Sequence, residues 1–495
     1  MKRLFVSAVL VVFCACTFVF GQASAAGQMI SSADLKSDLA ILRRAYEQLH
    51  PGLYRYNTKA QMDASFADLE RQFSRDMSLR EAYVKISVFL AKVKCGHTYT
   101  NFYNQPKSIV EALFKGKNRV PFYFRWLDGQ MIVTRSFDAD TNIKPGTEIV
   151  SINGTQAKEI LEKLMTIARA DGSNDAKRVS YLEVGGNDRW EAFDIYFPMF
   201  FPPKALQMEL VMRPIGSSKT VKALVMPLTD EERKAARLSD PEDPKNDKPA
   251  FTLERPDSST AILRMPTWAL YNSKWDWKKF VDETFDRLID EKVANLVIDI
   301  RANEGGQDVG DAVISRIADH EIVLSKTRRL VRYQKVPTDL IPYLETWDRS
   351  FDDWGKSASE KAGDFYILRR YDDDERGSVI KPSGRRYMGR VFVLVGAVNS
   401  SATFQFAQTV KLNKLATLVG QPTGGNQRGI NGGAFYFLNL PKSKIEVDLP
   451  LIGQFPIIEA PDTGIEPDIH VRPTATDIAA GRDTELATVK SMTQK

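Results

Sequence analysis

The sequence predicts a mixed α/β protein with several domains, because apolar residues follow three different patterns along the chain. Over residues 31–94 they return every three or four positions, which indicates amphipathic helices. From about Val120 to Pro227, short apolar runs alternate with turn signals, which indicates strands. Beyond residue 250, strand and helix patterns alternate, as in an α/β domain with a largely parallel sheet. A chain of 495 residues has room for two or three such domains.

Residues 1–25 have the features of a secretory signal peptide. Lys2 and Arg3 precede an apolar run over residues 4–20, and Ala23-Ser24-Ala25 offers small residues for cleavage. The run is short for a membrane-spanning helix, and no second apolar segment of spanning length follows it. We therefore expect export to the periplasm or the medium, with no stable membrane insertion once the signal is removed.

Charge and cysteine content exclude several classes of function. Removing Lys2 and Arg3 lowers the formal net charge from +5 to +3, which gives no support to nucleic-acid binding. Cys14 and Cys16 lie in the predicted signal peptide, so Cys95 is left without a partner for an intramolecular disulfide. The sequence shows no metal-ligand spacing and no phosphate-binding glycine loop, so it implies no metal and no cofactor.

Residues 26–110 are predicted to form an N-terminal module of three helices. Two of these helices begin with a serine and an acidic residue at the capping-box spacing: Ser31 with Asp34, and Ser78 with Glu81. Gly96 is expected to end the third helix in a left-handed conformation. His97 then lies on the loop just beyond that helix.

Residues 115–228 are predicted to form a β-rich domain. Lys144-Pro145-Gly146-Thr147 and Asn153-Gly154 supply turns around one strand, and Ala157–Met165 has a helical pattern. The pattern resembles a PDZ-like module, which captures an extended peptide by adding it to a sheet edge. Residues 229–250 follow with 12 charged residues at 22 positions, so we expect an exposed charged linker, or a solvated helix over its first part.

The α/β core is predicted to span residues 251–480. Its strands and helices are expected in the order Ala261–Leu263, Trp277–Ile289, Leu296–Ile300, Val309–Ile317, the Val391 strand, the helix after Ser401, and Leu415–Val419. Residues 320–389 interrupt this order with Trp347, Trp354 and many charged residues. We expect them to form a surface insertion that helps to cover a cleft.

The apolar run over residues 391–396 leads into Asn399-Ser400-Ser401-Ala402-Thr403 and then a helical pattern. In a sharp strand-to-helix turn, small residues let a hydroxyl project, while N–H groups at the helix start face developing negative charge. Ser401 is therefore the candidate nucleophile. The alternative is that Ser400 or Ser401 only caps the helix, since serine is a favoured N-cap residue.

A second turn with small residues follows the predicted strand over residues 296–300. Gly305 and Gly306 would let a substrate approach the backbone N–H groups closely. A serine that attacks a carbonyl needs such donors for the oxyanion. The same two glycines also fit an ordinary turn between a strand and a helix.

Four segments, in this order, resemble the motifs of the tail-specific (C-terminal-processing) serine peptidase family. They are Arg301–Gly306, Ser400-Ser401-Ala402, Gly420–Gly425 and Gly464–Asp468. The resemblance covers most of the chain after the signal segment, including His50-Pro51-Gly52-Leu53-Tyr54. It implies a crotonase-like α/β catalytic core and a polypeptide substrate.

One departure bears on the mechanism. In the Ser-Lys branch of the family a lysine serves as base, but Asn426 stands at the matching position, and Phe404 stands where that branch carries Glu. The tricorn-like branch uses a histidine from the N-terminal part and a glutamate downstream of the serine. His97 and Glu459 match those two places, so the resemblance is closer to this Ser-His-Glu branch.

The resemblance implies one role for each residue of the site. Ser401 attacks the peptide carbonyl, His97 moves the proton, and Glu459 orients His97. A histidine suits this task because its ordinary pKa of about 6.5 lets it exchange a proton near neutral pH. The N–H groups of Ala402 and of Gly305 or Gly306 would hold the oxyanion. Without the resemblance, His97 would be read as a cation at a helix C-terminus and Glu459 as a loop carboxylate.

The hypothesis from the sequence is thus an exported serine endopeptidase that acts through an acyl-enzyme. A second hypothesis is a noncatalytic binding protein of the same fold that holds an apolar ligand or a peptide, since the missing lysine would then mark lost activity. Phe435, Tyr436 and Phe437 fit the wall of an apolar pocket and equally a core strand. Ser401, His97 and Glu459 favour the enzyme, although fold alone does not fix function.

Overall fold

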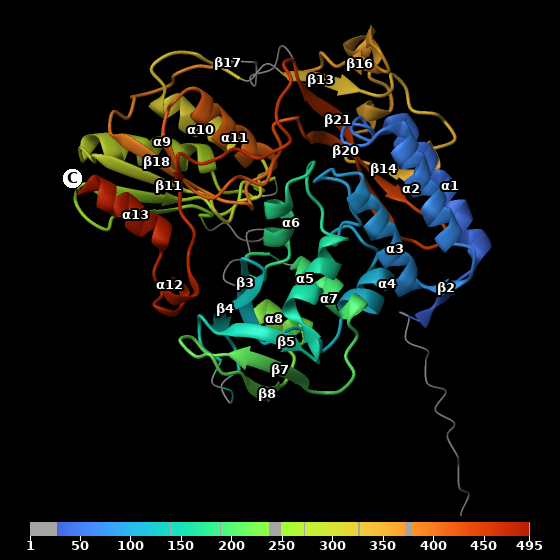
Figure 1. Ribbon diagram of the computed structural model, residues 1–495. Coiled ribbons are helices and arrows are strands. Elements are labelled where there is room, and N and C mark those ends of the chain that lie inside the picture. Colours follow the sequence, from blue (N-terminus) through green and yellow to red (C-terminus); the bar gives the residue numbers. More distant parts are fainter. Residues whose placement is uncertain are drawn as a thin grey trace, which may run out of the picture.

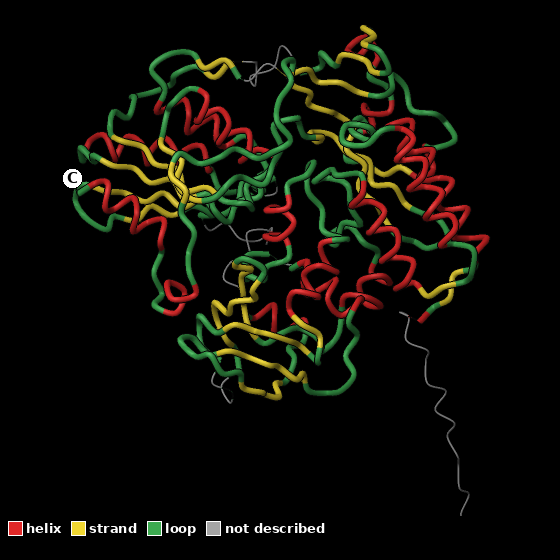
Figure 2. The backbone as a smooth tube through the Cα atoms, in the orientation of Figure 1, coloured by secondary structure: helices red, strands yellow, loops and turns green. Residues whose placement is uncertain are grey.

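The computed structural model describes residues 27–138, 141, 143–188, 190–236, 249–271, 273–324, 327–371 and 379–494. The predicted signal peptide and most of the predicted linker lie outside these residues. Figure 1 shows the N-terminal helices beside an antiparallel sheet, a second sheet with its own helices opposite them, and a β-rich domain below both. Figure 2 shows that loops join these parts at the centre of the molecule. Within the described residues, no helix is both long enough and apolar enough to span a membrane.

Three helices form at the N-terminus, as the periodicity of apolar residues predicts. They are α1 (Ser32–Leu49), α2 (Lys59–Gln72) and α3 (Leu79–Lys92), with the short strands β1 (Met29–Ile30) and β2 (Met77–Ser78) paired beside them. The side chains of Ser31 and Ser78 accept hydrogen bonds from the third backbone N–H of their helices, so both serines cap as predicted, without the second bond of a full capping box. Each helix buries its apolar face.

The prediction that Gly96 ends α3 in a left-handed conformation is wrong. Lys94 takes that conformation, with φ of 58°, two residues after the helix ends. Gly96 is needed for a different reason, because a β-carbon at this position would lie 2.7 Å from a carboxylate oxygen of Asp171. The glycine therefore permits a close contact beside His97.

The β-rich domain is built on one antiparallel sheet in the order β3-β4-β5-β7-β8. Its strands are β3 (Phe122–Leu127), β4 (Gln130–Ser136), β5 (Glu148–Ile152), β7 (Met208–Arg213) and β8 (Val221–Val225), with β6 (Thr155–Gln156) paired to β5. Asn153 and Gly154 have φ of 50° and 82°, which allows the predicted tight turn between β5 and β6. The predicted helix forms as α5 (Ala157–Met165).

Several helices of this region carry no clear signal in the sequence. They are α4 (Lys107–Ile109) with the π-helical turn Val110–Phe114, α6 (Asp175–Tyr181) and α7 (Ala192–Phe200). Helix α7 is buried on nearly all sides, so its apolar residues show no helical period. Part of the predicted linker also folds, as α8 (Asp230–Ala235), where Arg233 is buried and pairs with Asp194 at 2.8 Å. The first part of the segment is thus a mostly exposed helix, as the alternative expected, and only Arg233 is buried in it.

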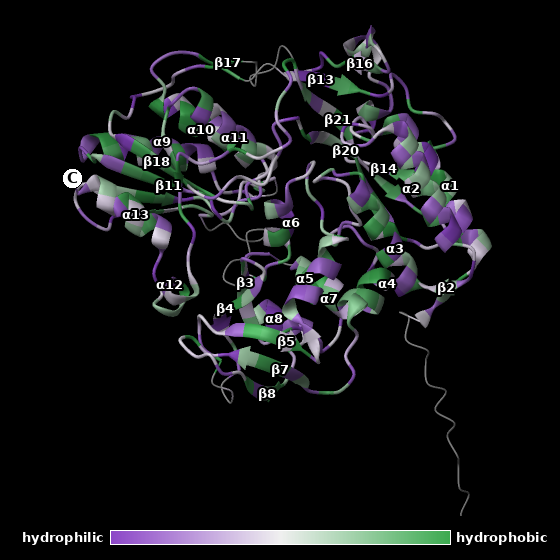
Figure 3. Cartoon of the chain, in the orientation of Figure 1, coloured by the Kyte–Doolittle hydropathy of each residue, from purple (hydrophilic) through white to green (hydrophobic). Residues whose placement is uncertain are grey.

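The C-terminal half contains a six-stranded sheet in the order β22-β19-β18-β11-β10-β9, parallel except at β9. Its strands are β9 (Thr252–Glu254), β10 (Thr260–Arg264), β11 (Asn295–Asp299), β18 (Arg390–Val395), β19 (Thr417–Gly420) and β22 (Ile469–His470). Helices α9 (Trp277–Asp290), α10 (Val309–Ile317) and α11 (Ser401–Leu412) cover one face, and α13 (Thr484–Thr493) covers the other. Burial on both faces explains the nearly continuous apolar strands, visible in green in Figure 3. Helix α12 (Ala475–Ala479) reaches the β-rich domain beside Gly146.

The expectation that residues 320–389 form a surface insertion is wrong for much of this segment. Four of its strands join two later strands in an antiparallel sheet ordered β14-β20-β21-β13-β16-β15. These strands are β13 (Thr327–Val331), β14 (Leu344–Glu345), β15 (Glu360–Ala362), β16 (Phe365–Ile367), β20 (Asn431–Asn439) and β21 (Glu446–Pro456); β12 (Ile322–Val323) pairs with β17 (Val379–Ile380) elsewhere. Three 3₁₀ turns, at Ile341–Tyr343, Arg349–Asp352 and Gly355–Ala358, connect them.

This antiparallel sheet shares its apolar core with the N-terminal helices. Leu344, Phe351 and Trp354 are buried in that core together with residues of α1 and α3. The parallel sheet has a separate core of its own. The two halves of the chain are therefore packed together, because the C-terminal half supplies the sheet on which the N-terminal helices pack.

Two buried carboxyl groups of β21 should make stability depend on pH. Burial and the neighbouring Asp448 raise the pKa of Glu446 to about 8, and burial raises the pKa of Asp448 to about 7. Both pKa values exceed those of the same groups in an unfolded chain, so the folded protein binds more protons. The free energy of unfolding therefore decreases as the pH rises from about 4 to 8. Each pKa unit corresponds to about 1.4 kcal/mol.

We therefore expect the melting temperature to fall between pH 5 and pH 9, and to fall less in Glu446→Gln. The substitution keeps the shape of the side chain and removes one of the two titrating groups. Thermal unfolding followed by circular dichroism across this pH range measures the effect. If the melting temperature fell equally with pH in the wild type and in Glu446→Gln, the raised pKa of Glu446 would be contradicted.

Candidate active site

The turn between β18 and α11 holds Ser401 in an unusual backbone conformation. Its φ is 50°, in the left-handed region, where a residue with a β-carbon is strained by about 1–3 kcal/mol. The side chain of Asn399 holds this turn, because its oxygen accepts from the N–H of Gly396 at 2.8 Å and its amide donates to the carbonyl of Asn303 at 3.0 Å. A strained strand-to-helix turn of this kind presents a nucleophile to a cavity.

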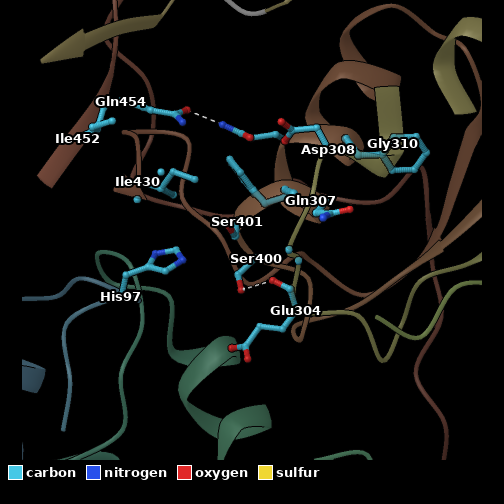
Figure 4. Close-up of a pocket in the computed structure, with 18 of the residues that line it drawn as sticks. His97, Glu304, Gln307, Asp308, Gly310, Ser400, Ser401, Ile430, Ile452 and Gln454 are labelled. Carbon is cyan, nitrogen blue, oxygen red and sulfur yellow. Dashed lines mark hydrogen bonds between the residues drawn. The ribbon is translucent and has the colours of Figure 1, made fainter. Parts of the chain in front are cut away.

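The two serines of the turn have different surroundings. Ser400 is buried at the N-cap position, but its hydroxyl donates to the carbonyl of Glu304 at 3.1 Å and does not cap the helix. Ser401 lines the cavity, and its hydroxyl makes no hydrogen bond within the described part of the chain. Figure 4 shows both serines at the cavity wall. The alternative of a simple capping serine does not account for Ser401.

His97 lies across the cavity from this turn. It follows Gly96 on the loop after α3, and Figure 4 shows its ring directed toward Ser400 and Ser401. The ring packs against Phe435 with 5.7 Å between centroids. Its Nδ1 atom is buried and has no hydrogen-bond partner in the described structure.

The other three histidines lie elsewhere, and all of them are described. His50 is buried, and its ring nitrogens contact the hydroxyl of Thr98 and the N–H of Gly52. Burial, with Arg55 nearby, lowers the pKa of His50 to about 3, so it remains a neutral structural residue. His320 and His470 are exposed. His97 is thus the histidine of the cavity.

Burial lowers the pKa of His97 below its ordinary value. Of the nearby charges, Asp171 and Glu304 oppose this shift, while Arg169 and Lys177 add to it. The neutral imidazole is therefore the favoured form near neutral pH. A general base must be in this form before it can accept a proton.

The predicted oxyanion donors lie against the Ser401 turn. Gly305 and Gly306 have φ of 123° and 134°, and a β-carbon on Gly305 would come within 2.9 Å of the Ser401 β-carbon. The N–H of Gly305 donates to the side chain of Asn303 at 2.9 Å, so it is already engaged. No hydrogen bond from the N–H of Gly306 or Ala402 occurs among the described residues. These two are the donors that remain available for an oxyanion.

The structure does not bring Glu459 to His97. Glu459 is exposed, although Ile457 and Ala460, on either side of it in the chain, line the cavity. No hydrogen bond or ion pair joins Glu459 to His97 in the described structure. The expected orienting contact is therefore absent, and Asp171 and Glu304 are the carboxylates that act electrostatically on His97.

Asn426 is a structural residue in the place of the family's lysine. It is fully buried, and its amide nitrogen donates to Asp462 at 2.7 Å and to the carbonyl of Asp171 at 3.2 Å. Its oxygen accepts from the N–H of Arg428 at 2.9 Å. Lys411, on the same helix as Ser401, pairs with Asp468 near the other end of that helix. Neither residue offers a base to Ser401.

Cys95 and the acidic residues show no sign of a second chemistry. Cys95 is buried and accepts a hydrogen bond from the Asn431 side chain at 3.2 Å, and burial raises the pKa of its thiol to about 11. A thiol in this state is a weak nucleophile. In the described ranges, no group of three or more His, Cys, Asp or Glu residues is arranged to hold a metal ion.

The cavity is lined by residues from every part of the chain. Its wall next to His97 is aromatic, because Trp347 packs on Phe435 and Phe437 with 6.0 and 5.9 Å between ring centroids. Trp347 remains 60% exposed. The predicted role of residues 320–389 in covering a cleft is thus consistent with the position of Trp347.

Comparison with known proteins indicates which reaction this site catalyses. Residues 259–471 match the model of peptidase family S41. The chain carries a peptidase family S41 domain. It is therefore a serine-type peptidase, whose substrates are polypeptides, and the domain contains Ser401, Gly305, Gly306 and Asn426. His97 lies outside the matched residues.

Two solved structures show the same fold over nearly the whole chain. A structure described as mature CPAF complexed with lactacystin has a TM-score of 0.64 at 14% identity, covering 93% of this chain and 98% of that one. Mature CPAF alone has a TM-score of 0.59 at 14% identity, covering 90% and 94%. The photosystem II D1 C-terminal processing protease is less similar, with a TM-score of 0.39 at 15% identity, covering 89% and 93%. No curated protein matches the chain in sequence.

Three charged residues near the site were not predicted. Arg169, Asp171 and Lys177 lie in the β-rich domain, in a segment that matches no motif. All three act on His97 through their charges. A sequence gives no signal of such contacts, because they depend on how two distant segments pack.

Proposed function

We propose that the protein is an exported serine endopeptidase in which Ser401 is the nucleophile and His97 is the general base. The observation that carries this proposal is the strained Ser401 turn, which faces a neutral imidazole across a shared cavity. The N–H of Ala402 belongs to this turn, and Gly305, the residue before Gly306, lies against it. The signal-like composition of residues 1–25 supports export.

The proposed reaction proceeds in two steps. His97 takes the proton of the Ser401 hydroxyl as its oxygen bonds to the peptide carbonyl carbon, and the oxyanion is held by Gly306 and Ala402. His97 then gives this proton to the leaving nitrogen as the C–N bond breaks, which leaves an acyl-enzyme. A water molecule, deprotonated by His97, then bonds to the ester carbonyl carbon. The bond from this carbon to the Ser401 oxygen breaks, His97 returns the proton to that oxygen, and the product leaves as a carboxylic acid.

The third member of the site differs from the Ser-His-Glu scheme. Since Glu459 is exposed, we propose that Asp171 and Glu304 supply the negative charge that supports the imidazolium ion. The structural role of Asn426 supports a mechanism outside the Ser-Lys branch. We also infer a crotonase-like core around the parallel sheet, and a PDZ-like module in the sheet of β3 to β8.

Incubation with casein tests the proposal. We expect internal peptides to accumulate in a time-dependent digestion, measured by mass spectrometry of the products. Release of terminal residues alone would contradict an endopeptidase.

The second candidate is a noncatalytic protein that binds an apolar ligand or a peptide. The aromatic wall of Trp347, Phe435 and Phe437 favours this candidate, although the same wall suits an apolar side chain of a substrate. Saturable quenching of tryptophan fluorescence by a casein peptide that is never cleaved would support it over the peptidase.

A further inference from the structure

Residues 169–177 lie after α5 and include the start of α6, and they contact four loops of the candidate site. This segment belongs to the β-rich domain, outside the matched peptidase domain. The contacted loops carry His97, Glu304, the residues before Ser401, and Asn426. The significance of these contacts rests on the proposed function, in which Ser401 is the nucleophile and His97 the base.

The first contacts hold the loop of His97. Asp171 accepts a hydrogen bond from the N–H of Gly96 at 2.9 Å, and the guanidinium of Arg169 donates to the carbonyl of Gly96. The same guanidinium lies over the ring of Tyr99, with 4.3 Å to its centroid. The residues on both sides of His97 are therefore fixed by one segment.

The second contacts hold the loops around Ser401. Glu304 accepts from Lys177 at 2.7 Å and from Arg169 at 3.1 Å, and its backbone carbonyl accepts from Ser400. Lys177 also donates to the carbonyl of Val398 at 3.0 Å. In Figure 4 the side chain of Glu304 points away from Ser401, as these contacts require.

The third contacts hold the loop of Asn426. Asn174 donates to the carbonyls of Thr423 and Gly425 at 2.9 and 2.8 Å, and Asn426 donates to the carbonyl of Asp171. Arg169 bonds both to the His97 loop, at Gly96, and to Glu304.

The charges of this cluster are partly removed from water. The side chains of Lys177 and Arg169 are 4% and 12% exposed, and such charges are stable only when they are paired. Burial alone would raise the pKa of Glu304, but Arg169 and Lys177 hold it well below its usual range. Glu304 therefore remains an anion that draws both cations toward the site.

We propose that residues 169–177 form a positioning segment that sets the geometry between His97 and Ser401, with Arg169 and Asp171 fixing the His97 loop. The segment also sets the charge around the imidazole. The carboxylates of Asp171 and Glu304 raise the pKa of the His97 imidazole, and the cations Arg169 and Lys177 lower it. All of them except Glu304 belong to the segment.

The test is the rate at which a fluorophosphonate probe modifies the full-length protein, measured against pH. Arg169→Lys keeps the charge but has a single donor group, which cannot hold both Gly96 and Glu304 in the same way. We expect this variant and Asp171→Ala to react about 100-fold more slowly at pH values where His97 is neutral, the loss typical of a catalytic group displaced by about 1 Å. Asp171→Asn, which keeps the acceptor oxygen, should recover most of that loss.

The pH profile distinguishes a positioning role from a purely structural one. The rate should fall at low pH as His97 gains a proton. Asp171→Asn removes a charge that raises the pKa of His97, so its acid limb should move to lower pH. Arg169→Gln removes a charge that lowers this pKa, so its acid limb should move to higher pH. Shifts in the same direction, or wild-type rates in Arg169→Lys and Asp171→Ala, would overturn the proposal.

Arg233→Gln is the matched control. It breaks a more deeply buried ion pair, with Asp194, in the same domain, and neither residue of this pair lines the cavity. We expect a lower melting temperature with an unchanged rate and pH profile. A shifted acid limb in this control would show that loss of stability alone produces the effect, and would overturn the proposal. Lack of modification of the wild-type protein would instead overturn the proposed function.

Discussion

Ser401→Ala is expected to lower kcat for polypeptide hydrolysis by a factor of about 10⁴ to 10⁶ with little loss of stability. The substitution removes the atom that would form the acyl-enzyme. The hydroxyl makes no hydrogen bond within the described residues, so its loss leaves no partner unsatisfied. Initial rates of casein digestion under substrate excess, with a melting curve of each protein, measure both effects.

Ser400→Ala is the control for this substitution, since Ser400 is the adjacent serine of the same turn. It loses one hydrogen bond to the carbonyl of Glu304, worth about 0.5–1.5 kcal/mol. We expect kcat to stay within about tenfold of the wild type. A loss in Ser400→Ala as large as that in Ser401→Ala would mean that the wrong hydroxyl has been chosen.

His97→Gln should produce the second large loss, a factor of about 10³ or more in kcat. Glutamine fills much of the same space and keeps polar atoms, but it cannot accept and return a proton near neutral pH. KM should change much less than kcat, because His97 acts on the reacting proton and not on distant parts of the substrate. Steady-state kinetics on a fluorogenic peptide separate the two constants.

His320→Gln is the matched control, because His320 is exposed and does not line the cavity. It should match the wild type in both constants. Should His97→Gln retain full activity, the proton must be taken by another group, and the proposed pair of Ser401 and His97 would be abandoned.

Local patterns in the sequence predicted the elements that are governed by local physics. Helices α1, α3 and α9 show regular apolar spacing, and the Asn153-Gly154 turn uses residues that tolerate positive φ. The alternation of strands and helices likewise predicted the parallel sheet around β11 and β18. The strained turn at Ser401 was foreseen because small residues followed a strand.

The features that could not be predicted depend on contacts between distant segments. Gly96 was expected to end a helix, but it is required by the carboxylate of Asp171, which lies 75 residues further along the chain. Trp354 was placed in a surface insertion, but it is buried in a core shared with the N-terminal helices. Glu459 was assigned beside His97 from the resemblance alone, and it is exposed, with no bond to His97 among the described residues.

The same reasoning explains why the charges at the site were missed. Arg169 and Lys177 resemble ordinary surface cations in the sequence, since neither belongs to a motif. Only the packing of the β-rich domain against the Glu304 loop buries them. The candidate site is therefore shared between the peptidase domain and the β-rich domain, although its motifs lie mostly in the former.

The central claim is that a hydroxyl from the C-terminal half meets an imidazole from the N-terminal module. Peptide mapping by mass spectrometry after reaction with a fluorophosphonate tests it most directly. We predict a single adduct on Ser401 in the wild-type protein and no adduct in His97→Gln under the same conditions. An adduct on another serine, or equal modification of Ser401 without the imidazole, would contradict the account.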